Sequence, residues 1–85
     1  MKFNEIKTGT IFTIWETPSY PKLKTNSGYV DLRDEIINNN PNHAVLSNDC
    51  RELKTNEIAE KFETTNEEID SWIKEKKEKF LKVNR

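Results

Sequence analysis

The 85-residue chain is predicted to have an α+β fold, a small antiparallel β-sheet or SH3-like barrel followed by a two-helix C-terminal unit. Two observations lead to this prediction. Up to residue 53, short β-branched and aromatic runs alternate with turn residues, a pattern typical of strands. From Leu53 onward, the apolar residues recur at helical spacing. We therefore expect a β-rich unit over residues 1–53 and a helical hairpin over residues 54–85, packed on each other as one compact domain.

The strands expected in the first half are short. Thr10–Trp15 is rich in β-branched and aromatic residues, and Gly9 marks a turn before it. Lys22–Thr25 and Tyr29–Arg33 flank Asn26-Ser27-Gly28, which has the composition of a hairpin turn.

Both faces of the first strand are apolar. Phe12 and Ile14 lie on one face, and Ile11, Thr13 and Trp15 lie on the other. A sheet with one side in water does not need this pattern. Either the helices cover the Ile11 side, or that side presents Trp15 to a partner.

An asparagine-rich loop is expected over residues 38–42, because Asn40 precedes Pro41 and is thereby disfavoured in the helical region. After this loop, His43–Leu46 and Cys50–Leu53 are predicted to form two further strands that pair with each other.

Two helices are predicted in the last third of the chain. The first begins near Thr55, and the second is capped by Thr65, with Glu68 three residues later as in a capping box. We expect the two helices to pack onto the sheet through Ile58, Phe62, Ile69, Trp72 and Ile73.

Residues 57–73, EIAEKFETTNEEIDSWI, place two amphipathic helices around a short turn. Ile58 and Phe62 anchor the first helix, and Ala59 is small where the second helix must cross it. This arrangement resembles the helix-turn-helix superfamily of DNA-binding proteins. The resemblance implies a second helix positioned to contact DNA. Such motifs favour glycine in the turn, and this chain has Glu63 there.

The composition argues against several classes of protein. Apolar residues make up 33% of the chain and charged residues 34%, against about 45–50% and about 25% in typical domains. No apolar run approaches the roughly 18 residues of a membrane span, and residues 1–7 lack the apolar stretch of a signal peptide. The single cysteine, Cys50, excludes an internal disulfide and fits a reducing compartment, so we expect a cytoplasmic protein.

No catalytic, cofactor or metal site is expected. The chain has only 2 glycines, which excludes a glycine-rich phosphate loop. His43 and Cys50 lack the further ligands that a zinc site requires. A core this small is also unsuited to enclosing a pocket that excludes water. We therefore expect a non-catalytic protein without a cofactor.

The charge distribution points to a protein partner. The net charge is −1, yet acidic residues dominate residues 26–72 and basic residues dominate residues 73–85. We expect a protein-binding module, as an inhibitor or accessory subunit, that docks an acidic and aromatic surface on a larger protein complex. The abundance of Lys, Asn and Ile is typical of AT-rich coding sequences and suggests a phage-type inhibitor. The candidate contact residues are Trp15, Tyr20, Tyr29, Glu67, Glu68 and Asp70.

The alternative is a nucleic-acid-binding regulator that uses the helix-turn-helix-like unit and the basic end of the chain. In that case lysines contact phosphates, while Trp15 and Tyr20 stack on bases. The candidate residues are Lys22, Lys24, Lys74, Lys76, Lys77 and Lys79. Structural explanations stay open beside both hypotheses: a solvated lysine-rich helix end, a core role for Trp15, and an acidic face that merely meets water.

Overall fold

The computed structural model describes residues 1–14 and 20–81. In chain order these form η1 (Phe3–Glu5, a 3-10 helix), β1 (Ile11–Ile14), β2 (Lys22–Lys24), β3 (Tyr29–Asp31), β4 (Ile36–Asn38), α1 (His43–Ser47), β5 (Cys50–Glu52), α2 (Thr55–Lys61) and α3 (Asn66–Phe80). The predicted α+β class is confirmed.

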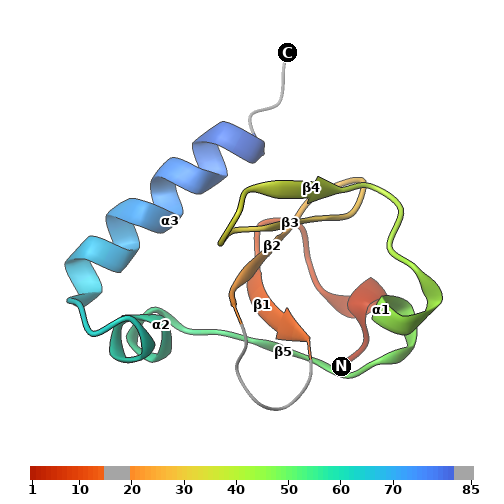
Figure 1. Cartoon of the computed structure of the whole chain (residues 1–85), viewed down its shortest axis with the longest axis horizontal. Helices are drawn as coiled ribbons and strands as arrows, with labels where there is room; N and C mark the ends of the chain where they lie inside the picture. Colours follow the sequence, from red (N-terminus) through yellow and green to blue (C-terminus); the bar gives the residue numbers. More distant parts are fainter. Residues whose placement is uncertain (15–19, 82–85) are drawn as a thin grey trace.

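The five strands form one antiparallel sheet in the order β4-β3-β2-β1-β5. Strands β1 to β4 follow one another as a meander, and β5 returns to the free side of β1, where Ile14 is opposite Cys50. The sheet is open rather than a closed barrel, because β4 and β5 are its two edges. Helices α2 and α3 lie on one side of the sheet, and η1 and α1 lie on the other (Figure 1).

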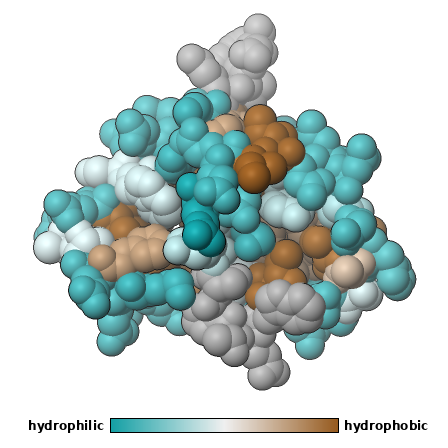
Figure 2. All heavy atoms as spheres, viewed as in Figure 1, coloured by the Kyte–Doolittle hydropathy of each residue, from teal (hydrophilic) through white to brown (hydrophobic). Residues whose placement is uncertain are grey.

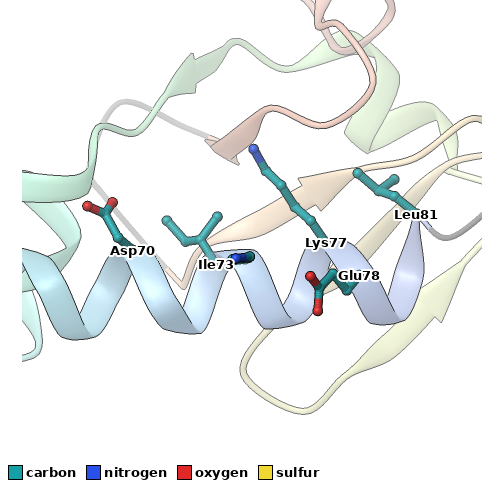
Figure 3. Close-up of a pocket in the computed structure, with 6 residues that line it drawn as sticks. Asp70, Ile73, Lys77, Glu78 and Leu81 are labelled. Carbon is teal, nitrogen blue, oxygen red and sulfur yellow. The ribbon is translucent and has the colours of Figure 1, made fainter.

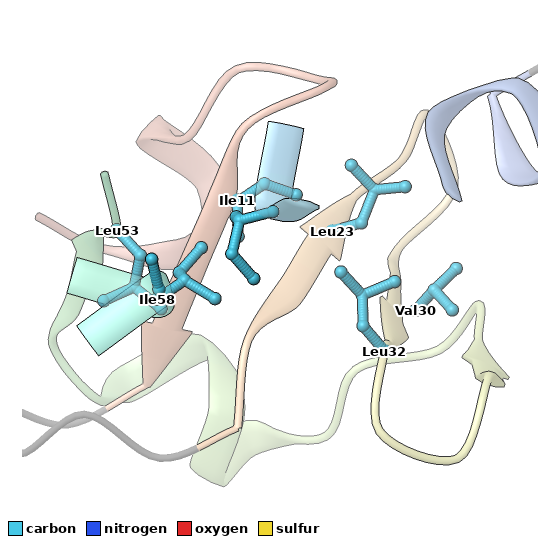
Figure 4. Packing of buried hydrophobic residues seen from close by; sticks show 8 residues of the cluster. Ile11, Leu23, Val30, Leu32, Leu53 and Ile58 are labelled. Carbon is cyan, nitrogen blue, oxygen red and sulfur yellow. The ribbon is translucent and has the colours of Figure 1, made fainter. Parts of the chain in front are cut away.

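The face toward α2 and α3 carries the larger apolar cluster. Strand residues Ile11, Leu23 and Val30 converge there with Ile58 from α2, as Figure 4 shows. The other buried members are Leu32, Leu53, Ala59 and Ile69, and the partly buried Phe62, Trp72, Ile73, Phe80 and Leu81 pack against them. The five residues predicted to join the helices to the sheet all belong to this cluster, so that prediction is confirmed.

The opposite face carries a smaller aromatic cluster. Phe3, Phe12 and Tyr29 meet edge-on, with ring centroids 5.9 to 6.3 Å apart. Ile6, Ile14 and Cys50 complete its buried part. Both faces of β1 are therefore buried, and Ile11 lies under the helices as one of the two expected arrangements required. Helices η1 and α1 cover this second face, so both faces of the sheet are packed against helices.

The prediction of a strand over His43–Leu46 is wrong, because this segment forms α1. The side chain of Asn42 accepts a hydrogen bond from the Val45 amide at 3.0 Å and caps the first turn. The expected partner strand does form as β5, but it pairs with β1 instead. Strand β4 was not predicted, and it pairs with β3 through Val30 opposite Ile37.

Both C-terminal helices are confirmed. The Thr65 hydroxyl accepts from the Glu68 amide at 3.2 Å and caps α3. At the end of α2, Glu63 adopts a left-handed φ of 56°. The Thr64 amide then donates to the Ala59 carbonyl at 2.9 Å and the Glu63 amide to the Glu60 carbonyl at 3.2 Å. These two bonds make a Schellman motif, which requires a left-handed residue even though glycine is absent here.

Ion pairs tie the helices to the sheet. Glu57 of α2 accepts from Arg51 of β5 at 2.8 Å and from the Lys54 amide at 2.9 Å. The amide and the guanidinium lower the pKa of the Glu57 carboxyl. Before β4, Glu35 accepts hydrogen bonds from Lys76 and Lys79 of α3. These two ammonium groups lower the pKa of Glu35 from 4.5 to about 2.

Candidate protein-binding surface

Three aromatic rings form a row where the β2 side of the molecule meets the helical hairpin. Tyr20 lies 6.2 Å from Phe62, and Phe62 meets Trp72 edge-on at 6.0 Å. Tyr20 is 36% exposed, and the other two rings are partly buried against the larger cluster. Partly exposed aromatic side chains anchored in this way are the residue type that most often dominates binding at protein interfaces.

The row ends at an acidic depression on the outer side of α3. Its lining consists of Glu67, Glu68, Ser71, Trp72, Lys74, Glu75 and Glu78. The lining thus includes four carboxylates, the Lys74 ammonium and Trp72, whose ring centre also lies 5.8 Å from the Lys76 ammonium. We call Tyr20, Phe62, Trp72, Glu67 and Glu68 the acidic–aromatic surface. Among the predicted contact residues, Tyr20 lies at one end of this row and Glu67 and Glu68 lie at the other, with Phe62 and Trp72 between them.

Basic side chains lie at the other end of the row. The Arg33 guanidinium lies 4.3 Å from the centre of the Tyr20 ring, and the Lys61 ammonium lies 6.0 Å from it. The surface is therefore basic beyond Tyr20 and acidic beyond Trp72. A partner that covers the whole row meets charge of opposite sign at its two ends.

Asp70 lies apart from the other two predicted acids. It lines a second depression together with Ile73, Lys74, Lys77, Glu78 and Leu81. Figure 3 shows Asp70, Ile73, Lys77 and Leu81 pointing from α3 toward the sheet, whereas Glu78 points away. Asp70 also accepts a hydrogen bond from the Thr55 hydroxyl at 3.0 Å, which joins the starts of α2 and α3.

Of the two further predicted contact residues, one is buried and the other lies outside the described residues. Tyr29 is buried in the aromatic cluster, and its hydroxyl accepts from the Asn38 side chain at 3.2 Å. We therefore assign Tyr29 to the core and remove it from the candidate contacts. Trp15 lies outside the described residues, so its predicted roles in contact or core stay predictions.

Four of the six candidate phosphate-binding lysines have partners within the chain. Lys22 donates to the Tyr20 carbonyl at 3.2 Å, and Lys24 donates to the Ile6 carbonyl at 2.8 Å and lies 4.8 Å from the Phe3 ring centre. Both lie on the aromatic-cluster face, because Lys22 is opposite Phe12. Lys76 and Lys79 bind Glu35.

The remaining two lysines, Lys74 and Lys77, both line the depression in Figure 3. The ring of Tyr20 packs on Phe62 at the helical side, away from Lys22 and Lys24. The structure therefore does not gather Tyr20, Lys22 and Lys24 on one face as a stacking platform would require.

Sequence reasoning missed the packing of Phe62 against Tyr20 and the whole of β4. Phe62 was predicted only as a core anchor, and its packing against Tyr20 joins residues 42 positions apart in the chain. The adjacent Ile36 and Ile37 were the signal for β4, since β-branched residues favour strands. The strand was not predicted because it has only three residues and runs directly into the asparagine-rich loop.

Comparisons with known proteins do not assign the chain to a family: no family model, curated protein or solved structure matches it. Across residues 1–14 and 20–81, no helix combines the length and apolarity needed to cross a membrane. In the same ranges, no group of three or more His, Cys, Asp or Glu side chains is arranged to hold a metal ion.

Proposed function

We propose that this chain is a small non-catalytic protein-binding module that docks its acidic–aromatic surface on a larger protein, with a lysine- or arginine-rich segment of that protein at the end formed by Trp72, Glu67 and Glu68. The observation that carries the proposal is the row Tyr20–Phe62–Trp72, which ends among Glu67 and Glu68. An inhibitor or an accessory subunit of a complex acts through this kind of surface, because neither requires chemistry of its own.

Two physical contributions support a basic partner. An ammonium or guanidinium group of the partner, placed in the depression beside Trp72, would contact both an aromatic ring and carboxylates. Charge complementarity of this kind accelerates association and selects against acidic partners. The anchored rings supply apolar contact area at little cost in side-chain entropy, since Phe62 and Trp72 are already packed against the core.

The test uses a short lysine- and arginine-rich peptide as the probe and an acidic peptide of equal length for comparison. Isothermal titration calorimetry of the folded chain should detect binding of the basic peptide and no binding of the acidic peptide. Glu67→Gln together with Glu68→Gln should weaken binding about fivefold or more, at about 0.5–1 kcal/mol for each exposed charge. Tyr20→Ala should weaken it by a smaller factor, because Tyr20 lies beside Arg33 and Lys61 and apart from the carboxylates that attract the peptide.

A matched control removes the same charge elsewhere. Asp34→Asn with Glu52→Gln changes two exposed acids outside the acidic–aromatic surface and should leave the affinity within a factor of two or so of the wild type. Equal losses of affinity in the two double variants would mean that only the net charge matters, and would refute the docking site.

The nucleic-acid alternative predicts the opposite response. Removing Glu67 and Glu68 should then strengthen binding to duplex DNA, whereas Lys74→Gln with Lys77→Gln should abolish it. These two lysines are chosen because Lys76 and Lys79 hold Glu35, so their loss would also disturb the fold.

A further inference from the structure

The edge strand β4 carries an exposed apolar pair. Ile36 and Ile37 are 58% and 57% exposed, and they are adjacent on the last strand of the sheet. Figure 2, in the orientation of Figure 1, shows a hydrophobic patch over β4 bordered by hydrophilic side chains. Edge strands are protected by short length, as β4 is, and often also by lysine, proline or a bulge, because their free backbone groups pair with other strands. Its three residues include neither lysine nor proline.

Hydrogen-bond alternation identifies which backbone groups of β4 are free. The Thr25 amide donates to the Gly28 carbonyl at 2.9 Å, and the Leu32 amide donates to the Pro21 carbonyl at 3.1 Å. In an antiparallel ladder these bonds recur at every second residue. Gly28, Val30 and Leu32 therefore turn their backbone groups toward β2, while Tyr29 and Asp31 turn theirs toward β4.

The same alternation continues into β4. Tyr29 is opposite Asn38 and Asp31 is opposite Ile36, so Ile36 and Asn38 use their amides and carbonyls toward β3. Ile37 is opposite Val30 at a position without ladder bonds. Its amide N–H and carbonyl consequently point to the outer side of β4, where no strand of the described ranges pairs with it.

We propose that β4 pairs antiparallel with β4 of a second copy of this chain, about a twofold axis at Ile37. The two Ile37 residues would each donate one backbone hydrogen bond and accept one. Ile36 of each copy would lie opposite Asn38, and Glu35 would lie opposite Asn39. The contact is then the same patch on both copies, as a twofold interface requires.

Charge favours a second copy in this register. The acids Asp34 and Glu35 meet Asn40 and Asn39 of the other copy and not each other. Glu35 is also already neutralised by Lys76 and Lys79 within its own chain. The net charge of −1 adds little repulsion between copies. A pair of three-residue strands buries less than the roughly 1,200–2,000 Å² of a standard interface, so the dimer should be weak and concentration-dependent.

Sedimentation equilibrium of the full chain tests the dimer. The apparent mass should rise from 10.1 kDa toward twice that value between about 20 µM and about 1 mM. Over the same range, amide exchange followed by NMR should slow at Ile37, while Ile36 and Asn38 should be protected at every concentration. A mass that stays at 10.1 kDa up to the highest concentration would overturn the proposal.

Two variants separate this interface from any other. Ile37→Pro removes the outward N–H and spares the ladder to β3, and Ile37→Lys places like charges face to face on the axis. Both should remain monomeric at about 1 mM with an unchanged circular dichroism spectrum. Leu46→Lys, at an exposed apolar residue of α1, is the control and should still dimerise. If the proline variant unfolds, the lysine variant decides, and a dimer that persists in it refutes β4 as the interface.

Discussion

The cluster between the sheet and the helical hairpin should make residues 1–53 and the helices unfold together. Ile58 is the residue to change, because it is 1% exposed and links α2 to β1 and β2 side chains in one cluster. Ile58→Ala deletes three buried carbon atoms. At about 0.8 kcal/mol for each carbon this amounts to about 2.5 kcal/mol, and the cavity left behind adds to it.

A chain of this size has a free energy of unfolding of about 3–5 kcal/mol, so the variant keeps at most about 0.5–2.5 kcal/mol. Its melting temperature should fall by about 10–20 °C. The Ile58→Val variant, which deletes one carbon, should lose about 0.5–1.5 kcal/mol and serves as the graded control.

Two probes on opposite sides of the sheet make the assay decisive. Helix melting is followed by circular dichroism, and opening of the smaller cluster by reaction of the buried Cys50 thiol. Burial also raises the pKa of this thiol and slows its reaction in the folded state. We predict one coincident transition for both probes. Helices that melt while Cys50 stays protected would refute the single cooperative unit, as would a loss below about 1 kcal/mol.

Two other predictions concern the charged and strained positions. Glu35 has a lower pKa when folded than when unfolded, so its ion pairs stabilise the protein above about pH 4.5 and lose that effect as the pH falls toward about 2. The urea midpoint of Glu35→Gln should therefore lie below that of the wild type at pH 7, and the gap should close at low pH; a constant gap would contradict the sign. Glu63→Gly should raise the free energy of unfolding by about 0.5–1 kcal/mol, because glycine adopts the observed φ of 56° without strain. Glu63→Val should lower it, and a thermal melt that ranks valine above glycine would contradict the assignment.

Much of the fold follows from local signals in the chain. Thr65 identified the start of α3, and the turn at Asn26-Ser27-Gly28 identified the β2–β3 hairpin, since both depend on nearby residues alone. The error at His43–Leu46 arose because Val45 and Leu46 fit either a strand or a helix, and the Asn42 cap decided between them.

The candidate surface was less predictable because it depends on tertiary contacts. Tyr29 has the composition of a contact residue but fills the space beside Phe3 and Phe12. Lys76 and Lys79 belong to a basic run, yet their charges are held by Glu35, more than 40 residues away. The spacing of residues along the sequence does not predict such long-range pairs.

The central claim is that the acidic–aromatic surface receives a basic protein segment. The most direct test is an NMR titration of the labelled chain, first with a lysine- and arginine-rich peptide and then with duplex DNA at about 50 and about 200 mM salt. We predict that the peptide shifts the Trp72 indole and the Glu67 and Glu68 amides and leaves Lys77 unchanged. A peptide without effect on these groups, together with salt-sensitive shifts at Lys74 and Lys77 on adding DNA, would contradict the account.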